Sequence, residues 1–273
     1  MFATFVVVWR ESLEAVLIVA ILLAYLRRIG EGSRAGWIYG GVAVALLACA
    51  AFAYGAEFIA GMFAGAGEEI FQATVMVIAA VTVTAMVVWM HGQARNLRGG
   101  LERQAGLFVE RGQLASLALL AGIAVFREGA ETTLFLWGLA ESVSASRNQL
   151  LLAGAAGAAA ALVVGYLIFK SAARLNLKIF FQVTSIVLVF IAAGMLAQAA
   201  NRLIGVGLLP PMIGQVWNSS WLLDERGWLG SLAAQLFGYR SRPSLLELAI
   251  YAAYFPAVFV LMRRASLHQQ IAS

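Results

Sequence analysis

The feature that most constrains this chain is a pair of charged motifs, each set inside an otherwise apolar segment. Arg-Glu-Ser-Leu-Glu occupies residues 10–14, and Arg-Glu-Gly-Ala-Glu occupies residues 127–131. A charge at the centre of a membrane helix costs about 2.5–3.5 kcal/mol on the insertion scale. A chain that keeps six such charges needs partners for them and a use for them.

The spacing within each motif predicts what it can do. Successive residues of a helix turn by about 100°, so the two glutamates of a motif lie about 60° apart on one face. The arginine precedes the second glutamate by four residues, so each guanidinium can pair with one carboxylate. With all groups ionised, two negative charges stay uncompensated, which favours a cation site. The candidate ligands are Glu11, Glu14, Glu128 and Glu131, and their candidate partners are Arg10 and Arg127.

A small residue follows the first glutamate of each motif, Ser12 in one and Gly129 in the other. Small residues at helix interfaces let backbones approach closely in membranes. We therefore expect the two motif helices to pack tightly at this point.

The remainder of the chain predicts an all-α integral membrane protein. Of its 273 residues, 62% are hydrophobic and only 12% are charged, which is typical of polytopic membrane proteins. Apolar runs long enough to span a bilayer predict seven transmembrane helices. These runs are Phe2–Leu26, Trp37–Ala60, Ile70–Met90, Leu114–Leu139, Leu150–Phe169, Ile179–Ala200 and Leu245–Met262.

Basic residues predict the orientation. Twelve of the 19 Lys and Arg residues fall in residues 27–34, 95–111, 170–178 and 263–264, which share one side of a seven-helix chain. Cytoplasmic loops carry such an excess, so we expect the N-terminus outside and the C-terminus in the cytoplasm. The protein is then a multi-pass protein of the cell (inner or plasma) membrane. Its net charge of +5 reflects topology and not nucleic-acid binding.

An inverted repeat is also predicted. The motifs lie three helices apart, so their helices run in opposite directions, and Phe-Gln-Ala-Thr at 71–74 is echoed by Phe-Gln-Val-Thr at 181–184. We expect repeat one at about 1–92, repeat two at about 113–201, an outer loop at about 202–243, and helix seven at about 244–262. Substrate sites of such transporters lie near the midplane between the repeats.

Two further groups of residues are candidates for a role in cation transport. One group would supply oxygen ligands behind the carboxylates, or polar contacts between helices: Gln72, Thr74, Gln182 and Thr184. The other would gather cations at the outer mouth, or would be ordinary solvated loop charges: Glu68, Glu69, Asp224 and Glu225. Part of the long outer loop is expected to fold over that mouth.

Paired Arg-Glu-x-x-Glu motifs in a seven-helix chain resemble those of the oxidase-dependent iron transporters, a family that includes the bacterial EfeU-type iron permeases and the fungal high-affinity iron permease. The likeness continues at 86–90, 174–177 and 237–239 and covers nearly the whole chain. It implies an iron permease whose motif glutamates carry the ion. It also implies an extracytoplasmic partner that oxidises iron and delivers Fe³⁺, with iron as substrate and no prosthetic group. One departure is Gln72, where EfeU-like sequences often have Glu.

The residues themselves leave alternatives open. Carboxylates suit hard cations and disfavour Cu(I), but they do not separate Fe³⁺ from Fe²⁺, Mn²⁺ or protons. The chain could transport another hard divalent cation, or it could be a structural membrane subunit in which the motifs are salt bridges. An enzyme is not expected, because the sequence contains no His-Glu-x-x-His, no Ser/His/Asp set and no aspartate-rich diphosphate motif.

Overall fold

The computed structural model describes residues 2–93, 97–142, 147–171, 177–225 and 227–272. Within these ranges the chain is helical, with turns and loops between the helices and no strand. The α-helices are α1 (Phe2–Arg28), α2 (Ala35–Ala60), α3 (Ala66–Gln93), α4 (Leu97–Glu110), α5 (Leu114–Ser142), α6 (Arg147–Ser171), α7 (Leu177–Gly205), α8 (Trp228–Phe237) and α9 (Leu245–Ala272). A short 3₁₀ turn, Gly32–Arg34, precedes α2.

Each of the seven apolar runs forms one long helix, as expected. Five of these helices, α2, α3, α6, α7 and α9, are long and apolar enough to cross a membrane. The other two, α1 and α5, have 27 and 29 residues and each carries the three charges of a motif. The chain is therefore a multi-pass helical membrane protein.

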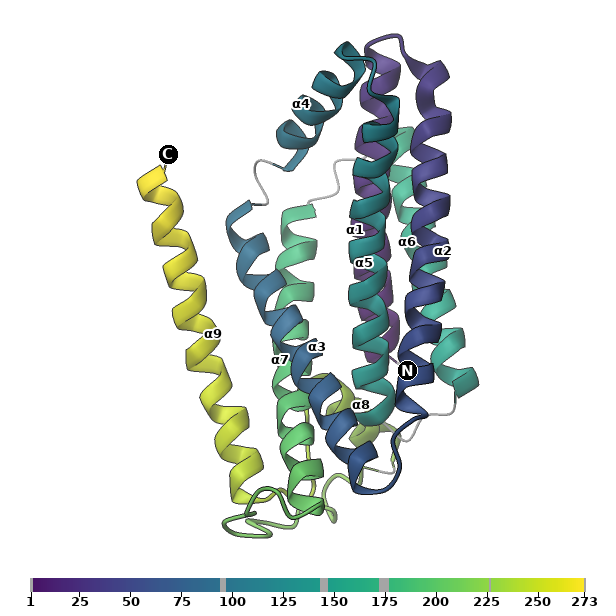
Figure 1. Cartoon of the computed structure of the whole chain (residues 1–273). Coiled ribbons are helices and arrows are strands. Elements are labelled where there is room, and N and C mark those ends of the chain that lie inside the picture. Colours follow the sequence, from purple (N-terminus) through teal and green to yellow (C-terminus); the bar gives the residue numbers. More distant parts are fainter. Residues whose placement is uncertain (1, 94–96, 143–146, 172–176, 226, 273) are drawn as a thin grey trace.

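Consecutive long helices alternate in direction, so α1 and α5 run antiparallel (Figure 1). In the bundle, α1 packs against α6, α2 against α5, and α3 against α7. Helix α9 packs on the outside of α3 and α7. The segments 27–34 and 103–111, which carry basic residues, lie at the opposite end of the bundle from α8 (Figure 1).

Glycines let two of these helix pairs approach closely. A Cβ on Gly41 of α2 would lie 2.0 Å from the carbonyl oxygen of Ala118 in α5, and one on Gly157 of α6 would lie 2.7 Å from that of Phe5 in α1. Gly40 and Gly55 have no neighbour within 4 Å of such a Cβ. The glycine-rich composition of α2 and α6 therefore serves packing at particular positions only.

Two apolar cores lie on either side of the motifs. One includes Val7 of α1 and Phe135 of α5 together with buried residues of α3, α7 and α9. The other includes Leu22 of α1 and Ala121 of α5 together with residues of α2 and α4. Because each motif falls between these positions in its helix, the charged residues lie between two layers of buried apolar side chains.

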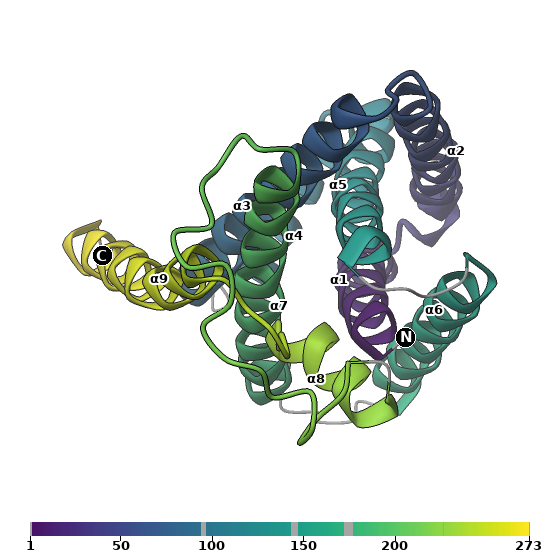
Figure 2. The ribbon, with the colours of Figure 1, turned by 90° about the horizontal axis from the view of Figure 1, so that it is seen from below.

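The loops at the two ends add two shorter helices. Helix α4 packs against α1 and α5 at one end, and α8 packs against α7 and α1 at the other (Figures 1 and 2). The loop that leads to α8 is tied down by backbone bonds, such as Val216 N–H to Pro243 O at 2.9 Å and Ser219 N–H to Ser241 O at 2.9 Å. The expectation that part of the long loop folds over one end of the bundle agrees with this arrangement.

Candidate cation site

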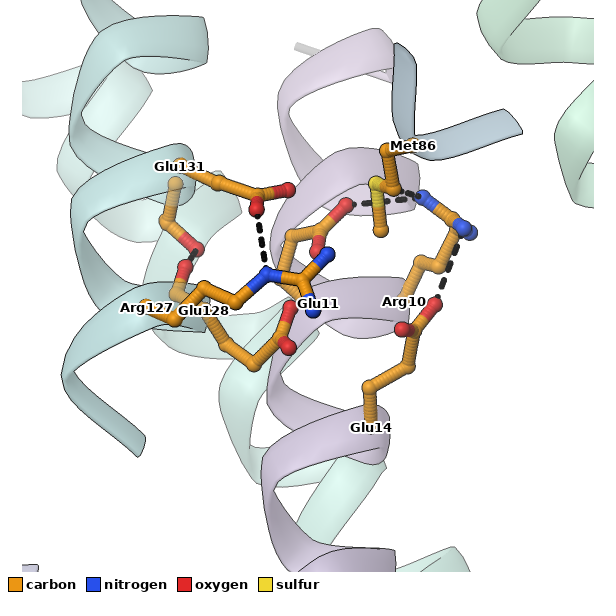
Figure 3. A network of polar contacts seen from close by, with 8 residues as sticks. Arg10, Glu11, Glu14, Met86, Arg127, Glu128 and Glu131 are labelled. Carbon is orange, nitrogen blue, oxygen red and sulfur yellow. Dashed lines mark hydrogen bonds and ion pairs between the residues drawn. The ribbon is translucent and has the colours of Figure 1, made fainter. Parts of the chain in front are cut away.

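The two motifs meet between α1 and α5, near the middle of both helices (Figure 3). Arg10 and Glu11 are fully buried, and Glu128 and Glu131 are 4% and 8% exposed. Groups as polar as these are buried only when they are paired or hold an ion. Their arrangement therefore decides what this part of the protein can bind.

In the first motif, Arg10 contacts both glutamates of its own helix. Its Nη1 donates to Glu11 Oε1 at 2.9 Å, and its Nη2 lies 2.9 Å from Glu14 Oε1. Nη1 also donates to the thioether sulfur of Met86 in α3, at 3.1 Å. The guanidinium is thus contacted by two carboxylates of its own helix and by one neutral acceptor from α3.

In the second motif, Arg127 donates through Nε to Glu131 Oε1 at 2.9 Å. Its guanidinium carbon lies over the indole ring of Trp89, 4.9 Å from the ring centre, again on α3. The two motifs differ in exposure, because the side chain of Arg127 is 42% exposed and that of Arg10 is not exposed at all. Among the contacts described for this structure, Glu131 forms an ion pair with an arginine and Glu128 does not.

Three carboxylates converge between the helices. One carboxylate oxygen from each of Glu11, Glu128 and Glu131 lies within 4.8 Å of the other two. Two oxygens bound to one cation at about 2.0–2.4 Å each are at most about 4.8 Å apart, so this spacing fits a single ion. Each of these residues also has a buried Oε2 atom with no hydrogen-bond partner in the described structure. Unpaired buried carboxylate oxygens are costly unless a cation joins them.

The fourth glutamate is placed differently. Glu14 pairs with Arg10 and is 13% exposed on its side chain, and it is not one of the three converging residues. The sequence treats the four glutamates as equivalent ligands, whereas the structure groups three of them and sets Glu14 about one helical turn away along α1.

The small residue of the second motif faces a helix other than the one we expected. A Cβ on Gly129 would lie 2.3 Å from the sulfur of Cys49, which belongs to α2. Gly129 therefore permits close packing of α5 on α2, and the expected close contact with the other motif helix is not made at this glycine. The reason is geometric, since the glutamates on the opposite side of the turn already face α1.

The polar residues of the repeat echo form two pairs, near the starts of α3 and α7, which lie at opposite ends of the bundle (Figure 1). Gln72 donates to Glu68 at 3.3 Å and accepts a bond from Arg202, and it precedes Met86 by about 21 Å along α3 at 1.5 Å per residue. Thr74 donates to the carbonyl oxygen of Ile70 at 2.8 Å within its own helix. In α7, Thr184 is buried and Gln182 is exposed. The contacts of Gln72 and Thr74 are thus with the end of the bundle and not with the motif glutamates.

The acidic residues proposed for the outer mouth are partly neutralised. Glu69 pairs with Arg202 of α7 at 2.7 Å, and Glu225 accepts bonds from the N–H and hydroxyl of Ser241 at 2.5 and 2.8 Å. Glu68 and Asp224 are exposed. An open recess of about 480 Å³ at this end is lined by Glu69, by Arg202 and four more residues of α7, and by the residue after α7: Gln198, Asn201, Ile204, Gly205 and Val206.

Sequence reasoning did not assign a role to Met86 or Trp89. These residues are three positions apart on α3 and therefore share one face of that helix. They occur in the stretch 86–90 that supports the family resemblance, but no spacing rule connects them with the motifs. Only the side-chain contacts of the folded chain show that Met86 meets Arg10 of α1 and that Trp89 meets Arg127 of α5.

The fold and this site together define a class. A multi-pass helical membrane protein that holds three buried carboxylates between two antiparallel helices has the architecture of a cation permease.

Comparison with known proteins gives the family. Residues 1–267 match the Iron permease FTR1 family, and the chain belongs to that family. It is 35% identical over 270 residues to the ferrous iron permease EfeU of Escherichia coli O6:K15:H31, covering 97% of each chain. It is 30% identical over 266 residues to the ferrous iron permease EfeU of Yersinia pestis, covering 96% of this chain and 93% of that one. No solved structure matches. These relatives are named as permeases and not as enzymes.

Proposed function

We propose that this protein is an iron permease in which Glu11, Glu128 and Glu131 bind the ion midway through the membrane. The observation that supports the proposal best is the convergence of these three carboxylates within 4.8 Å from two antiparallel helices. Family membership and the names of the relatives agree with it. Iron is the transported substrate, and the proposal includes no prosthetic group.

We propose seven membrane crossings in two inverted three-helix repeats plus α9, with the N-terminus outside and the C-terminus in the cytoplasm. Charge asymmetry of the loops and the alternating helix directions (Figure 1) support this topology. The basic loops then lie in the cytoplasm, and α8 lies at the outer face of the cell membrane.

A direction of travel follows from this orientation. Because α1 and α5 are antiparallel, Glu14 and the backbone of Arg127 are the motif positions nearest the proposed cytoplasmic ends of their helices. Their side chains are 13% and 42% exposed, compared with 0% for Glu11. We propose that Glu14 accepts the ion as it leaves the cluster. Glu68, Glu69, Asp224 and Glu225 would gather ions at the opposite, outer mouth.

We propose Fe³⁺ as the ion that the cluster carries, supplied by an iron-oxidising or iron-delivering partner outside the membrane. Three hard anionic oxygen ligands favour a small, highly charged cation. The relatives named here are called ferrous iron permeases, so the oxidation state is a point for direct measurement.

The test is uptake by the purified chain in proteoliposomes, with Fe²⁺, Fe³⁺ and Mn²⁺ supplied separately. Wild-type protein should accumulate iron, and Glu128→Gln should not, although it should reach the membrane and stay folded. Glu110→Gln is the matched control, because Glu110 is exposed in α4 and far from the cluster.

Two outcomes favour the alternatives. Uptake of Mn²⁺ in preference to both iron ions would make the protein a transporter of another hard divalent cation. Absence of uptake of all three ions, together with loss of folding in every motif variant, would make the motifs structural salt bridges of a membrane subunit.

A further inference from the structure

Both motif arginines are contacted by one face of α3, a helix that contributes no carboxylate to the cluster. Met86 accepts from Arg10 Nη1 at 3.1 Å, and Trp89 lies under Arg127 at 4.9 Å. Each arginine thus has one uncharged partner on α3 in addition to its glutamate partners. Because an uncharged side chain of α3 contacts the arginine in both motifs, we expect the two contacts to have the same role.

The chemical nature of these partners matters. A thioether is a weak acceptor, and an aromatic face attracts a cation through its quadrupole. Neither group carries charge, so both can orient a guanidinium without neutralising it. A carboxylate in either place would remove the positive charge and add another candidate ligand. The uncharged partners therefore leave the balance between four carboxylates and two guanidiniums unchanged.

The cluster needs the arginines to be held in place. Glu11 and Glu131 each use Oε1 for an arginine and keep a buried Oε2 without a hydrogen-bond partner. A guanidinium has five donors, so a small turn of either arginine would let it bond those free oxygens as well. Arg10 and Arg127 would then compete with the incoming ion for the same oxygens.

We propose that Met86 and Trp89 are positioning residues for the cation site. They fix the guanidiniums of Arg10 and Arg127 in their present pairings, so that the Oε2 atoms of Glu11, Glu128 and Glu131 stay available for the ion. This inference rests on the proposed function only in naming iron as the ion, since it concerns any hard cation that the cluster binds.

The experiment compares variants that remove each contact with variants that retain it. Met86→Leu keeps the side-chain volume and removes the acceptor, whereas Met86→Gln keeps a neutral acceptor. Trp89→Leu removes the aromatic face, whereas Trp89→Phe keeps one. Matched controls are Met195→Leu, at a buried methionine packed on Gly138, and Trp137→Leu, at a tryptophan stacked edge-on against Phe71.

Two measurements are made on the full chain: KM and maximal rate of iron uptake in proteoliposomes, and equilibrium binding of Tb³⁺, a hard trivalent probe, to detergent-solubilised protein. We expect Met86→Leu and Trp89→Leu to raise the KM and the Tb³⁺ dissociation constant by about three- to tenfold, in line with one lost contact of this kind. The maximal rate per folded protein should change less. Met86→Gln and Trp89→Phe should stay nearer to wild type than the leucine variants.

The inference would be overturned if the two leucine variants had the same KM and Tb³⁺ affinity as the glutamine and phenylalanine variants. It would also be overturned if the two control variants showed the same rise in KM and in the Tb³⁺ dissociation constant. If a leucine variant does not accumulate, the glutamine or phenylalanine variant decides, because it must then bind Tb³⁺ within about twofold of wild type. Wild-type protein that takes up no iron would remove the proposed function. The positioning role would still be supported if Tb³⁺ affinity followed the predicted order.

Discussion

Glu14 and Glu131 occupy the same place in their motifs, yet only Glu131 shares a cluster with carboxylates of both helices. Glu131 lies with Glu11 and Glu128, whereas Glu14 lies beside Arg10 at 2.9 Å. The arginines do not explain the difference, since Glu14 and Glu131 each lie 2.9 Å from the arginine four residues before them, and it follows instead from how α1 and α5 are packed together. Two motifs of one pattern therefore place their second glutamates differently in the folded protein.

The first prediction separates binding from release. Glu11→Gln, Glu128→Gln and Glu131→Gln should each weaken Tb³⁺ binding by at least about tenfold, the effect of about 1.4 kcal/mol. Glu14→Gln should lower the maximal rate of iron uptake while changing Tb³⁺ affinity less than any of the three. Titration and uptake on the same preparations provide the comparison. An equal loss of Tb³⁺ affinity in all four variants would show that the four glutamates are equivalent ligands and would contradict this prediction.

The second prediction separates a ligand from a salt-bridge partner at Glu14. Removing one member of a buried ion pair costs about 3–5 kcal/mol, whereas replacing the whole pair is often neutral. Arg10→Gln combined with Glu14→Gln removes this pair but also the arginine partner of Glu11, so Arg10→Gln alone is the control. The double variant should fold, as judged by a symmetrical gel-filtration peak, and should transport less iron than this control. Near-normal uptake by this double variant would show that Glu14 serves only to neutralise Arg10.

The third prediction concerns the contact between α5 and α2. Gly129→Ala places a Cβ 2.3 Å from the sulfur of Cys49 and should destabilise the protein by about 1–3 kcal/mol through overcrowding. Cys49→Ala in the same chain should recover most of the loss, because it removes the sulfur. Thermal unfolding in detergent measures both. Gly55→Ala is the control, since a Cβ there meets nothing within 4 Å, and a comparable loss in that variant would contradict the account.

The fourth prediction concerns topology. A tag at the N-terminus should be accessible to protease from outside intact cells, and one at the C-terminus only after the membrane is opened, because the basic loops belong in the cytoplasm. Accessibility of both tags from one side would contradict seven crossings and the inverted repeat.

Much of the fold could be predicted from the sequence because a bilayer imposes a simple rule. A spanning segment must be apolar and helical, and each of the seven apolar runs became one long helix. The helix ends lie within five residues of those expected, except that α9 continues ten residues past Met262 to Ala272. The charges of 10–14 and 127–131 stood out against this background, and the helix period placed Glu11 and Glu14, or Glu128 and Glu131, on one face. Helix α8 was less predictable, because its ten residues are too short for that rule.

By itself, then, the sequence determined the seven long helices, the two charged motifs and the family, because hydropathy, helix period and motif spacing are local properties. Only the tertiary structure decided which residues meet. It grouped Glu11 with Glu128 and Glu131 and set Glu14 beside Arg10, it turned Gly129 toward Cys49, and it brought Met86 and Trp89 to the arginines. The physical reason is that rotation of a helix about its axis is set by packing against all its neighbours, and no single segment contains that information.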